Sequence, residues 1–353
     1  MTDIVITYVD FTCKQWRAEY ERAINEIYDS NIHTRDSATR TRFVNHGELR
    51  FLLRSLSVNM SWVRNIYIVV DDYLIIPSWI NYNKNDNLSS IKIVRHSELF
   101  PISEFRKCLP TFNSQAIETV IHRIPGISDP FIYFNDDMFV GKPIYPYDLF
   151  HKPDDNSIDS QCKCAVLLST HHSKYGTPIV TDIGFRCAWQ NVNRILNKHF
   201  CLSYSNRYKL EHAPYVISPR LMEEIWTKFN TEMDYTMHSR FRSIHDVNVS
   251  PALHPYYALH TDNGFIKTDI SVKTIYLNMS DKAETRSKLS TITSSSSSSS
   301  SSSELPHFFC IEDEDGCEES DNSIRIFLEQ HFPNKSVYET EELIPLEPLS
   351  PLS

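Results

Sequence analysis

The chain has 353 residues, of which 41% are hydrophobic and 12% aromatic, and its formal net charge is −10. This length and composition are sufficient for a sizeable hydrophobic core in one large or two modest domains. The acidic balance argues against a nucleic-acid-binding protein, which usually presents a basic surface, although it allows a local basic pocket. No uninterrupted apolar segment approaches the roughly 18 to 20 residues that are needed to span a bilayer.

Four short apolar stretches in the first 140 residues have the composition of buried strands, because they are rich in β-branched and aromatic residues. They cover residues 3–9, 66–70, 91–94 and 131–134. Three of them run into carboxylates, which are Asp10, then Asp71 with Asp72, and finally Asp136 with Asp137 after Asn135. Carboxylates without partners are not buried in an apolar core, so each strand should emerge where its acids begin.

Helical patterns lie between these strands. Leu49, Leu52, Leu53 and Leu56 form one apolar helix face, and residues 114–123 are a second candidate helix. Strands that alternate with helices predict an α/β fold with a doubly wound, mostly parallel sheet. Ligands bind at the carboxyl ends of such strands, so the acidic strand ends predict a nucleotide–metal cleft. The alternative is a set of coincidental acidic turns on the surface.

The adjacent acids Asp136 and Asp137 are the leading candidates for holding a metal or ordering the substrate, and Asp136 is also a candidate catalytic residue. Mg²⁺ and Mn²⁺ take oxygen ligands and commonly bridge to phosphate. Neighbouring side chains on a strand face opposite sides, so only one of the pair need point into the cleft. Asp313 is a further metal candidate, whose alternative is a solvated acidic tail. Asp10 is a candidate for the nucleotide site, and is otherwise a turn or N-cap residue.

The chain divides into five predicted regions. Residues 1–150 form the α/β region, and residues 151–290 form a helical and mixed region. Residues 291–304 contain ten consecutive serines, which predict a disordered linker. Residues 305–340 begin with the apolar run 308–311, which we expect to return to the main sheet as a strand and, with a following helix, to complete the catalytic core. Residues 341–353 should form a loose tail.

Eight cysteines are scattered along the chain, and no paired CxxC arrangement occurs. A zinc site is therefore not expected. The first strand begins at Asp3, which leaves no room for a signal peptide, and we expect free thiols in a reducing cytosol. The expected location is cytoplasmic.

Four blocks of sequence carry a family resemblance. The first covers residues 4–10, and the second runs in segments from residue 45 to residue 137. The third combines residues 211–214, 239–242 and 246–248, and the fourth covers residues 308–313. Together these blocks resemble the Stealth family of hexose-1-phosphate transferases, which includes bacterial capsule polymerases and the lysosomal-targeting GlcNAc-1-phosphotransferase. Two positions depart from the family pattern: Phe11 replaces a usual glycine, and Glu312 replaces a usual asparagine.

The resemblance implies a fold similar to the GT-A nucleotide-sugar-binding fold, with residues 151–290 serving the acceptor and catalysis. It further implies peripheral association with a membrane through a partner, because capsule-making members work at the cytoplasmic membrane face. It also implies transfer of a hexose 1-phosphate, with GlcNAc as the first sugar to consider, from a UDP-sugar to a hydroxyl of an oligo- or polysaccharide. That reaction forms a phosphodiester and releases UMP. One alternative is a metal-dependent glycosyltransferase that releases UDP, and another is a catalytically inactive carbohydrate-binding protein. The family blocks favour the first function over both alternatives.

The blocks also assign candidate roles to individual residues. His212, in the third block, could act as general base toward the acceptor hydroxyl, since histidine titrates near neutral pH. Arg242 is the candidate that stabilises the transferring phosphoryl group, with Arg240 as its close competitor. The alternative for His212 is a structural hydrogen bond.

Polar residues of the second block are candidates for holding the substrate. Arg50 and Arg54 share one helix face and could grip the diphosphate, but they could equally pair with carboxylates such as Glu48 or Asp71. Asn113 and Asn135 could orient phosphate or sugar hydroxyls through their amide groups. Glu48 is a further candidate for substrate binding.

Overall fold

A computed structural model describes residues 2–43, 45–82, 90–151, 162–172, 183–203, 207–277, 282–293, 305–313 and 318–340. Its central sheet has five strands in the order β3-β2-β1-β4-β9. The strands are β1 (Ile4–Thr7), β2 (Asn65–Val70), β3 (Ser90–Arg95), β4 (Phe131–Asn135) and β9 (Tyr215–Ile217). The first four run parallel, and β9 is antiparallel to β4. The predicted α/β fold with a mostly parallel sheet is therefore confirmed.

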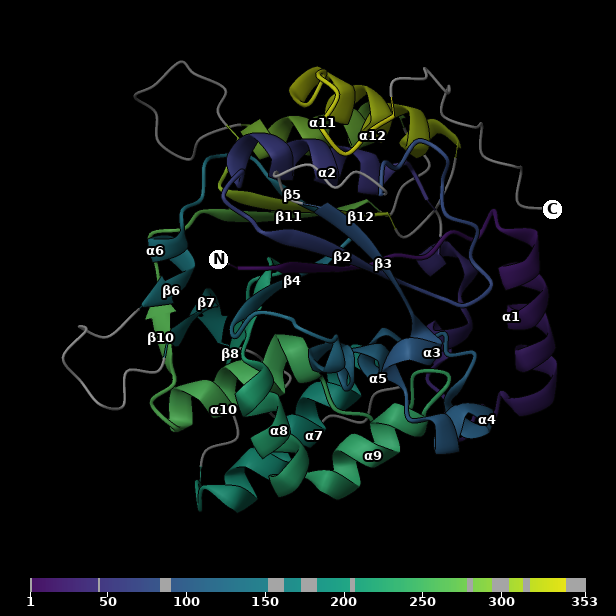
Figure 1. The fold of residues 1–353 in the computed structure, drawn as a ribbon, viewed down its shortest axis with the longest axis vertical. Helices are drawn as coiled ribbons and strands as arrows, with labels where there is room; N and C mark the ends of the chain where they lie inside the picture. The colour runs from purple at the N-terminus through teal and green to yellow at the C-terminus, as the bar shows by residue number, and fades with distance from the viewer. Residues whose placement is uncertain are drawn as a thin grey trace.

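Helices cover both faces of this sheet (Figure 1). On one side lie α2 (Glu48–Asn59), α11 (Lys282–Thr293) and α12 (Glu318–His331). On the other lie α5, α7, α8, α9 and α10, with bounds Ser114–Glu118, Gly184–His199, Pro219–Lys228, Asn230–His238 and His254–His260. Coverage on both faces explains why β1, β2 and β4 are nearly continuous apolar runs.

The two helices expected in the first region are present, with one difference in length. All four leucines of the predicted apolar face are buried in α2. The second helix stops at Glu118, and a 3₁₀ turn follows at Ile121–Arg123. The remaining helices are α1 (Lys14–Ile27), α3 (His96–Leu99), α4 (Phe105–Cys108) and α6 (Pro146–Leu149). Among the described residues, no helix is long and apolar enough to cross a bilayer.

The prediction that residues 308–311 return to the main sheet is wrong. These residues belong to β12 (Phe308–Asp313), which lies between β11 (Val272–Leu277) and β5 (Met138–Val140) in a separate three-stranded sheet. β12 pairs antiparallel with β5, placing Cys310 opposite Met138. Because β5 begins directly after Asp137, this pairing brings the fourth sequence block beside the second.

The helical and mixed region is joined closely to the first. Its strand β9 completes the central sheet, and its strands β7 (Lys163–His172) and β10 (Gly264–Lys267) form another sheet with β6 (Phe150–His151). β8 (Tyr208–Leu210) pairs with β7. Within the predicted linker, residues 291–293 end α11, and its other residues lie outside the described part of the chain, as does the predicted tail.

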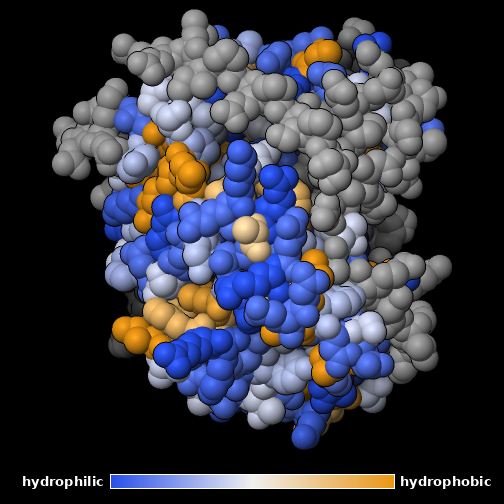
Figure 2. Space-filling view, turned by 90° about the vertical axis from the view of Figure 1, so that its right-hand side faces the viewer, coloured by the Kyte–Doolittle hydropathy of each residue, from blue (hydrophilic) through white to orange (hydrophobic). Residues whose placement is uncertain are grey.

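A cluster of buried aromatic side chains holds α1 against the rest of the molecule. Phe11, Trp16, Tyr20, Phe43, Phe112 and Phe241 form it. The outer surface on this side of the molecule is mainly hydrophilic at its centre (Figure 2). The cluster therefore packs the inner face of α1 against the segments near residues 43, 112 and 241, while the outer face of α1 is exposed to solvent.

Candidate active site

Carboxylates gather where β1 and β4 end. These carboxylates act on the buried hydroxyl of Tyr8. Burial, and then the negative charges of Asp10, Asp136 and Glu48, raise the pKa of Tyr8 well above its ordinary value. Asp10 also closes a local turn, because its Oδ1 accepts hydrogen bonds from the backbone N–H and the hydroxyl of Thr12 at 2.8 and 2.7 Å. The predicted convergence of Asp10 with Asp136 is thus present.

The acids after β2 do not join this group through any contact with its described members. Asp72 accepts hydrogen bonds from Ser97 at the start of α3, including one from the Ser97 backbone N–H at 3.1 Å. Asp71 accepts the backbone N–H of Tyr73 at 2.8 Å and lies 3.9 Å from Nδ1 of His96. Both serve local turns, so the site uses two of the three predicted acidic strand ends.

Asp136 lies in an unfavourable place for a charge. Burial raises the pKa of Asp136 well above its usual range, and the neighbouring Asp137 and Glu48 raise it further, while backbone amides of Asp136 and Val9 oppose them. Glu48 is buried at the start of α2, where its Oε2 accepts the backbone N–H of His46 at 2.6 Å. Carboxyls grouped in this way favour either a bound proton or a nearby cation.

His212 stands between two carboxylates from different sequence blocks. Its Nε2 lies 3.8 Å from Oδ1 of Asp137, and its Nδ1 lies 3.7 Å from Oε1 of Glu312. Burial alone would lower the pKa of His212, but Asp137 and Glu312 outweigh that effect and raise it. Nε2 of His212 and Oδ1 of Asp137 are both buried and lack a hydrogen-bond partner among the described residues. Both atoms therefore keep bonding capacity that a substrate or an ion could use.

Asp137, His212 and Cys310 each offer a ligand atom, and these atoms lie within 4.8 Å of one another. The set can hold a divalent metal. Its mixture of oxygen, nitrogen and sulfur matches a zinc-type site, whereas Mg²⁺ would use only the carboxylate of the three. Burial, followed by the charges of Asp137 and Glu312, raises the pKa of the Cys310 thiol well above its usual value. Asp313 ends β12 opposite Leu277, and its side chain lies outside the described part of the structure.

Glu118 is a buried carboxylate beside the candidate site that sequence reasoning did not single out. It is buried at the end of α5, and its Oε2 accepts the backbone N–H of Ser250 at 2.9 Å. Burial raises the pKa of Glu118 to about 7, and hydrogen bonds from Ser250 and the charges of Arg242 and His212 oppose that shift. A carboxylate within the apolar stretch 116–121 was the available signal.

Arg242 and Arg240 point to different places. Arg242 donates to Oγ of Ser114 at 3.2 Å and pairs with Oδ2 of Asp36 at 3.3 Å. Arg240 donates from Nε to the carbonyl oxygen of Pro110 at 2.6 Å. Of the two arginines, Arg242 is therefore the one whose charge acts on Glu118, on the side of the clustered acids.

Asn113 braces the loop that carries Arg242. Its side chain is fully buried, and its Nδ2 donates to the carbonyl oxygen of Ser239 at 2.9 Å and to Oδ2 of Asp246 at 2.8 Å. Its Oδ1 accepts the backbone N–H of Gln115 at the start of α5. These contacts use the amide that was expected to orient substrate. Asn135 ends β4 opposite Thr7 of β1, close to Asp136.

Arg50 and Arg54 make the structural pairings that the sequence left open, but with an unexpected partner. Arg54 holds both carboxylate oxygens of Glu339, with distances of 2.8 and 2.9 Å from Nε and Nη2. Nε of Arg50 lies 3.7 Å from the same carboxylate, and its guanidinium stacks over the Trp79 ring. This pair ties α2 to the segment after α12.

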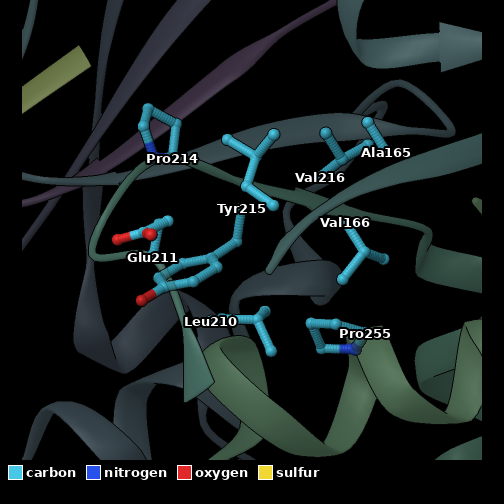
Figure 3. Close-up of a pocket in the computed structure, with 9 residues that line it drawn as sticks. Ala165, Val166, Leu210, Glu211, Pro214, Tyr215, Val216 and Pro255 are labelled. Atoms are coloured by element: carbon cyan, nitrogen blue, oxygen red, sulfur yellow. The ribbon is translucent and has the colours of Figure 1, made fainter. Parts of the chain in front are cut away.

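A small pocket lies behind the loop that carries His212. Figure 3 shows Glu211 and Pro214 at one end of it and Val166 and Pro255 at the other. The rest of the lining is Ala165, Leu167, Leu210, Tyr215 and Val216. Its mainly apolar lining supports the His212 loop and includes none of the candidate catalytic residues.

Comparison with known proteins identifies two family regions on this chain. The family model described as Stealth protein conserved region 2 matches residues 42–158, and the model of conserved region 3 matches residues 211–259. The structure joins these two regions at Asp137 and His212.

Relatives of similar sequence are named as polysaccharide phosphotransferases. An exopolysaccharide phosphotransferase of Streptomyces coelicolor is 31% identical over 96% of this chain and 52% of its own length. A capsular polysaccharide phosphotransferase of Haemophilus influenzae is 30% identical over 88% of this chain and 78% of its own. The capsular polysaccharide phosphotransferase LcbA of Neisseria meningitidis is 29% identical over 88% and 77%. The chain thus spans about half the length of the Streptomyces relative.

Among solved structures, the galactosyltransferase LgtC in complex with donor and acceptor sugar analogues overlaps with a TM-score of 0.36 and 8% identity, over 77% of this chain and 76% of LgtC. So low a TM-score carries no functional information. The two conserved regions and the relative from Haemophilus influenzae are sufficient: the chain belongs to the Stealth family.

Proposed function

We propose that this chain transfers a hexose 1-phosphate from a UDP-sugar to a hydroxyl group of a glycan acceptor, with UDP-GlcNAc as the first donor to test. The names of the relatives support a phosphotransferase acting on polysaccharide. The observation that carries the proposal is the meeting of Asp137 and His212 at 3.8 Å, beside Asp136 and Glu312. It combines a candidate base with a group of acids at the end of a parallel sheet.

The proposed reaction is a substitution at phosphorus. The acceptor oxygen forms a bond to the β-phosphorus of the UDP-sugar, and the bond from that phosphorus to the bridging oxygen breaks. UMP leaves, and the sugar stays on its phosphate in the new phosphodiester. Such reactions depend mainly on positioning and on neutralising charge on the transferring group.

His212 would take the proton of the acceptor hydroxyl. Its contacts with Asp137 and Glu312 fix the ring between two sequence blocks and leave Nε2 without a hydrogen-bond partner among the described residues. Arg242 would stabilise the phosphoryl oxygens, because a guanidinium group stays charged and donates two parallel hydrogen bonds.

Mg²⁺ or Mn²⁺ is the proposed cofactor, and it would supply positive charge to the phosphate oxygens. Asp137 would hold it through the carboxylate oxygen that lacks a hydrogen-bond partner among the described residues, with Asp136 and Glu312 as neighbouring acids. Asp10, Glu48 and Asn135 remain proposed substrate contacts at the same edge. A cytoplasmic location, with a partner at the membrane face, also stays a prediction.

The experiment is identification of the released nucleotide. Purified protein is incubated with UDP-GlcNAc or other UDP-hexoses, Mg²⁺ or Mn²⁺ and a panel of oligosaccharides, and the nucleotide is identified by mass spectrometry. We expect UMP that depends on the acceptor and is lost with His212→Asn. UDP as the product would make the chain a glycosyltransferase. If no acceptor-dependent nucleotide appears with any donor, the proposed activity is not supported.

A further inference from the structure

Two arginines from distant parts of the chain emerge from the same aromatic cluster. Arg42 precedes Phe43, and Arg242 follows Phe241. The rings of Phe43 and Phe241 both pack edge-on against the ring of Tyr20, with centroid distances of 5.3 and 6.0 Å. Because both phenylalanines pack on Tyr20, the guanidinium groups of Arg42 and Arg242 come near one another, although 200 positions separate them in sequence.

Each of the two guanidinium groups has a buried hydrogen-bond donor that no described residue accepts. Nη1 of Arg42 and Nε of Arg242 are buried, and neither has a hydrogen-bond partner among the described residues. The Arg42 side chain forms no hydrogen bond or ion pair with any described residue. Its guanidinium lies over the Phe43 ring, 5.5 Å from the ring centroid. A buried donor that stays unsatisfied is costly to the folded state, and a bound ligand is one way in which that cost is removed.

Asp36 is the acidic contact of these two arginines. Asp36 pairs with Arg242 at 3.3 Å, and its other oxygen accepts the backbone N–H of Gly184 at the start of α7. Burial, and then the charge of Arg242, lowers the pKa of Arg42 to about 9, while Asp36 opposes the shift. Asp36 is thus the carboxylate that contacts this arginine pair among the described residues, although the charge of Arg242 also acts on Glu118 and Asp246.

We propose that Arg42 and Arg242 form a binding site for a phosphate or diphosphate group. Paired guanidinium groups match phosphate oxygens in charge and in geometry. The charges of both Arg242 and His212 act on Glu118. This shared neighbour links the proposed anion site to the cluster of acids around His212. The further identification of its ligand as the diphosphate of the sugar nucleotide rests on the proposed function, and Arg42 then acts as a second phosphate-binding residue.

Inorganic pyrophosphate is a suitable probe, because its binding requires no turnover. Titration calorimetry on the full chain should show binding that weakens roughly tenfold or more in Arg42→Gln and in Arg242→Gln. Arg42→Lys keeps the charge without the planar fork and should recover part of the affinity. Arg17→Gln is the matched control, because Arg17 lies over Phe11 of the same cluster, and its affinity should not change. A thermal melt of each variant confirms folding.

The results separate this inference from the proposed function. The absence of pyrophosphate binding to the parent protein, an unchanged affinity in folded Arg42→Gln, or an equal loss in Arg17→Gln would overturn the anion site. Should Arg42→Gln not fold, Arg42→Lys decides, since full parental affinity there would also count against a bidentate site. Pyrophosphate binding that depends on both arginines, without release of UMP from any donor, would instead sustain the site and contradict the reaction.

Discussion

Phe11 stands where the family pattern has glycine, and the structure shows what the larger side chain does. Its ring is buried and makes edge-on contacts with Trp16 and Tyr20 at centroid distances of 5.8 and 6.1 Å. Phe11 is therefore part of the aromatic cluster that holds α1. It follows Asp10 directly, and the Asp10 carboxylate keeps its own hydrogen bonds to Thr12.

Phe11→Gly should lower the free energy of unfolding by about 3–5 kcal/mol, because it leaves a cavity in a packed cluster. Denaturant unfolding measures this change. The pyrophosphate affinity of the folded variant would show whether the cluster also sets the position of Arg42. A loss below about 1 kcal/mol would mean that the cluster closes around the smaller residue.

The metal donors allow a sharp test at the level of single atoms. If Mg²⁺ or Mn²⁺ is held by oxygen ligands, EDTA should abolish UMP release, Mg²⁺ or Mn²⁺ should restore it, and Asp137→Asn should not respond. Cys310→Ser should keep activity within a few-fold of the parent, because sulfur is a poor ligand for these ions. Restoration by Zn²⁺ alone, together with loss of activity in Cys310→Ser, would assign the mixed site to a zinc-type ion.

The local pattern of the sequence predicted Asp10, Asp136 and Asp137 as a group, because acids after parallel strands meet at one edge. His212 required the family resemblance, since nothing local places it beside Asp137. Glu118 and Arg42 were missed for a related reason. Their significance depends on burial and on partners that are distant in sequence, such as Ser250 and Arg242.

Among the elements, α2 acts as a clamp for the C-terminal segment. Arg54 and Glu339 form a two-point ion pair, and their side chains are only 11% and 4% exposed. Arg54 also donates from Nη1 to the carbonyl oxygen of Phe332 at 2.9 Å. The sequence showed that both arginines of α2 share a face, but it could not show a partner 285 residues away.

Glu339→Ala should lower the free energy of unfolding by about 3–5 kcal/mol, since it leaves buried guanidinium groups without their carboxylate. Urea denaturation gives the value. Glu284→Ala, which removes a more exposed ion pair to Lys288 within α11, should have little effect. Equal effects of the two substitutions would show that the Glu339 pair is no more important than a surface pair.

The position of β12 shows the limit of pattern reading for elements. An apolar run predicted the strand correctly, but its partner was wrong, because pairing is decided by contacts between distant segments. Phe309 of β12 stacks on Phe139 of β5 at 5.0 Å and on Phe332 after α12 at 6.3 Å. These contacts hold the strand in the small sheet, beside the turn that carries Asp137.

For the whole molecule, Asp3 links three segments at the amino-terminal edge of the sheet. Its carboxylate accepts hydrogen bonds from Arg64 Nε at 2.8 Å, from Asn65 Nδ2 at 2.9 Å and from the backbone N–H of Ser128 at 2.9 Å. Burial alone would raise the pKa of Asp3, but these donors lower it overall.

A lowered pKa in the folded state stabilises the protein above the unfolded value of about 3.9, and this contribution disappears as the pH falls through the folded pKa. Asp3→Asn should therefore cost about 2 kcal/mol of unfolding free energy at pH 7 and distinctly less near pH 3. Urea denaturation at both pH values measures the difference. The same cost at both would contradict a stabilising negative charge at Asp3.

The central claim, that the group at Asp137 and His212 transfers a sugar together with its phosphate, is tested most directly by following the β-phosphorus of the donor. The protein is incubated with a UDP-sugar that carries ³²P at the β-position and with an oligosaccharide acceptor, and His212→Asn serves as the control. We predict that the label moves to the glycan and that UMP is released unlabelled. Label that stays in UDP while the glycan gains an unlabelled sugar would contradict the account and indicate glycosyl transfer.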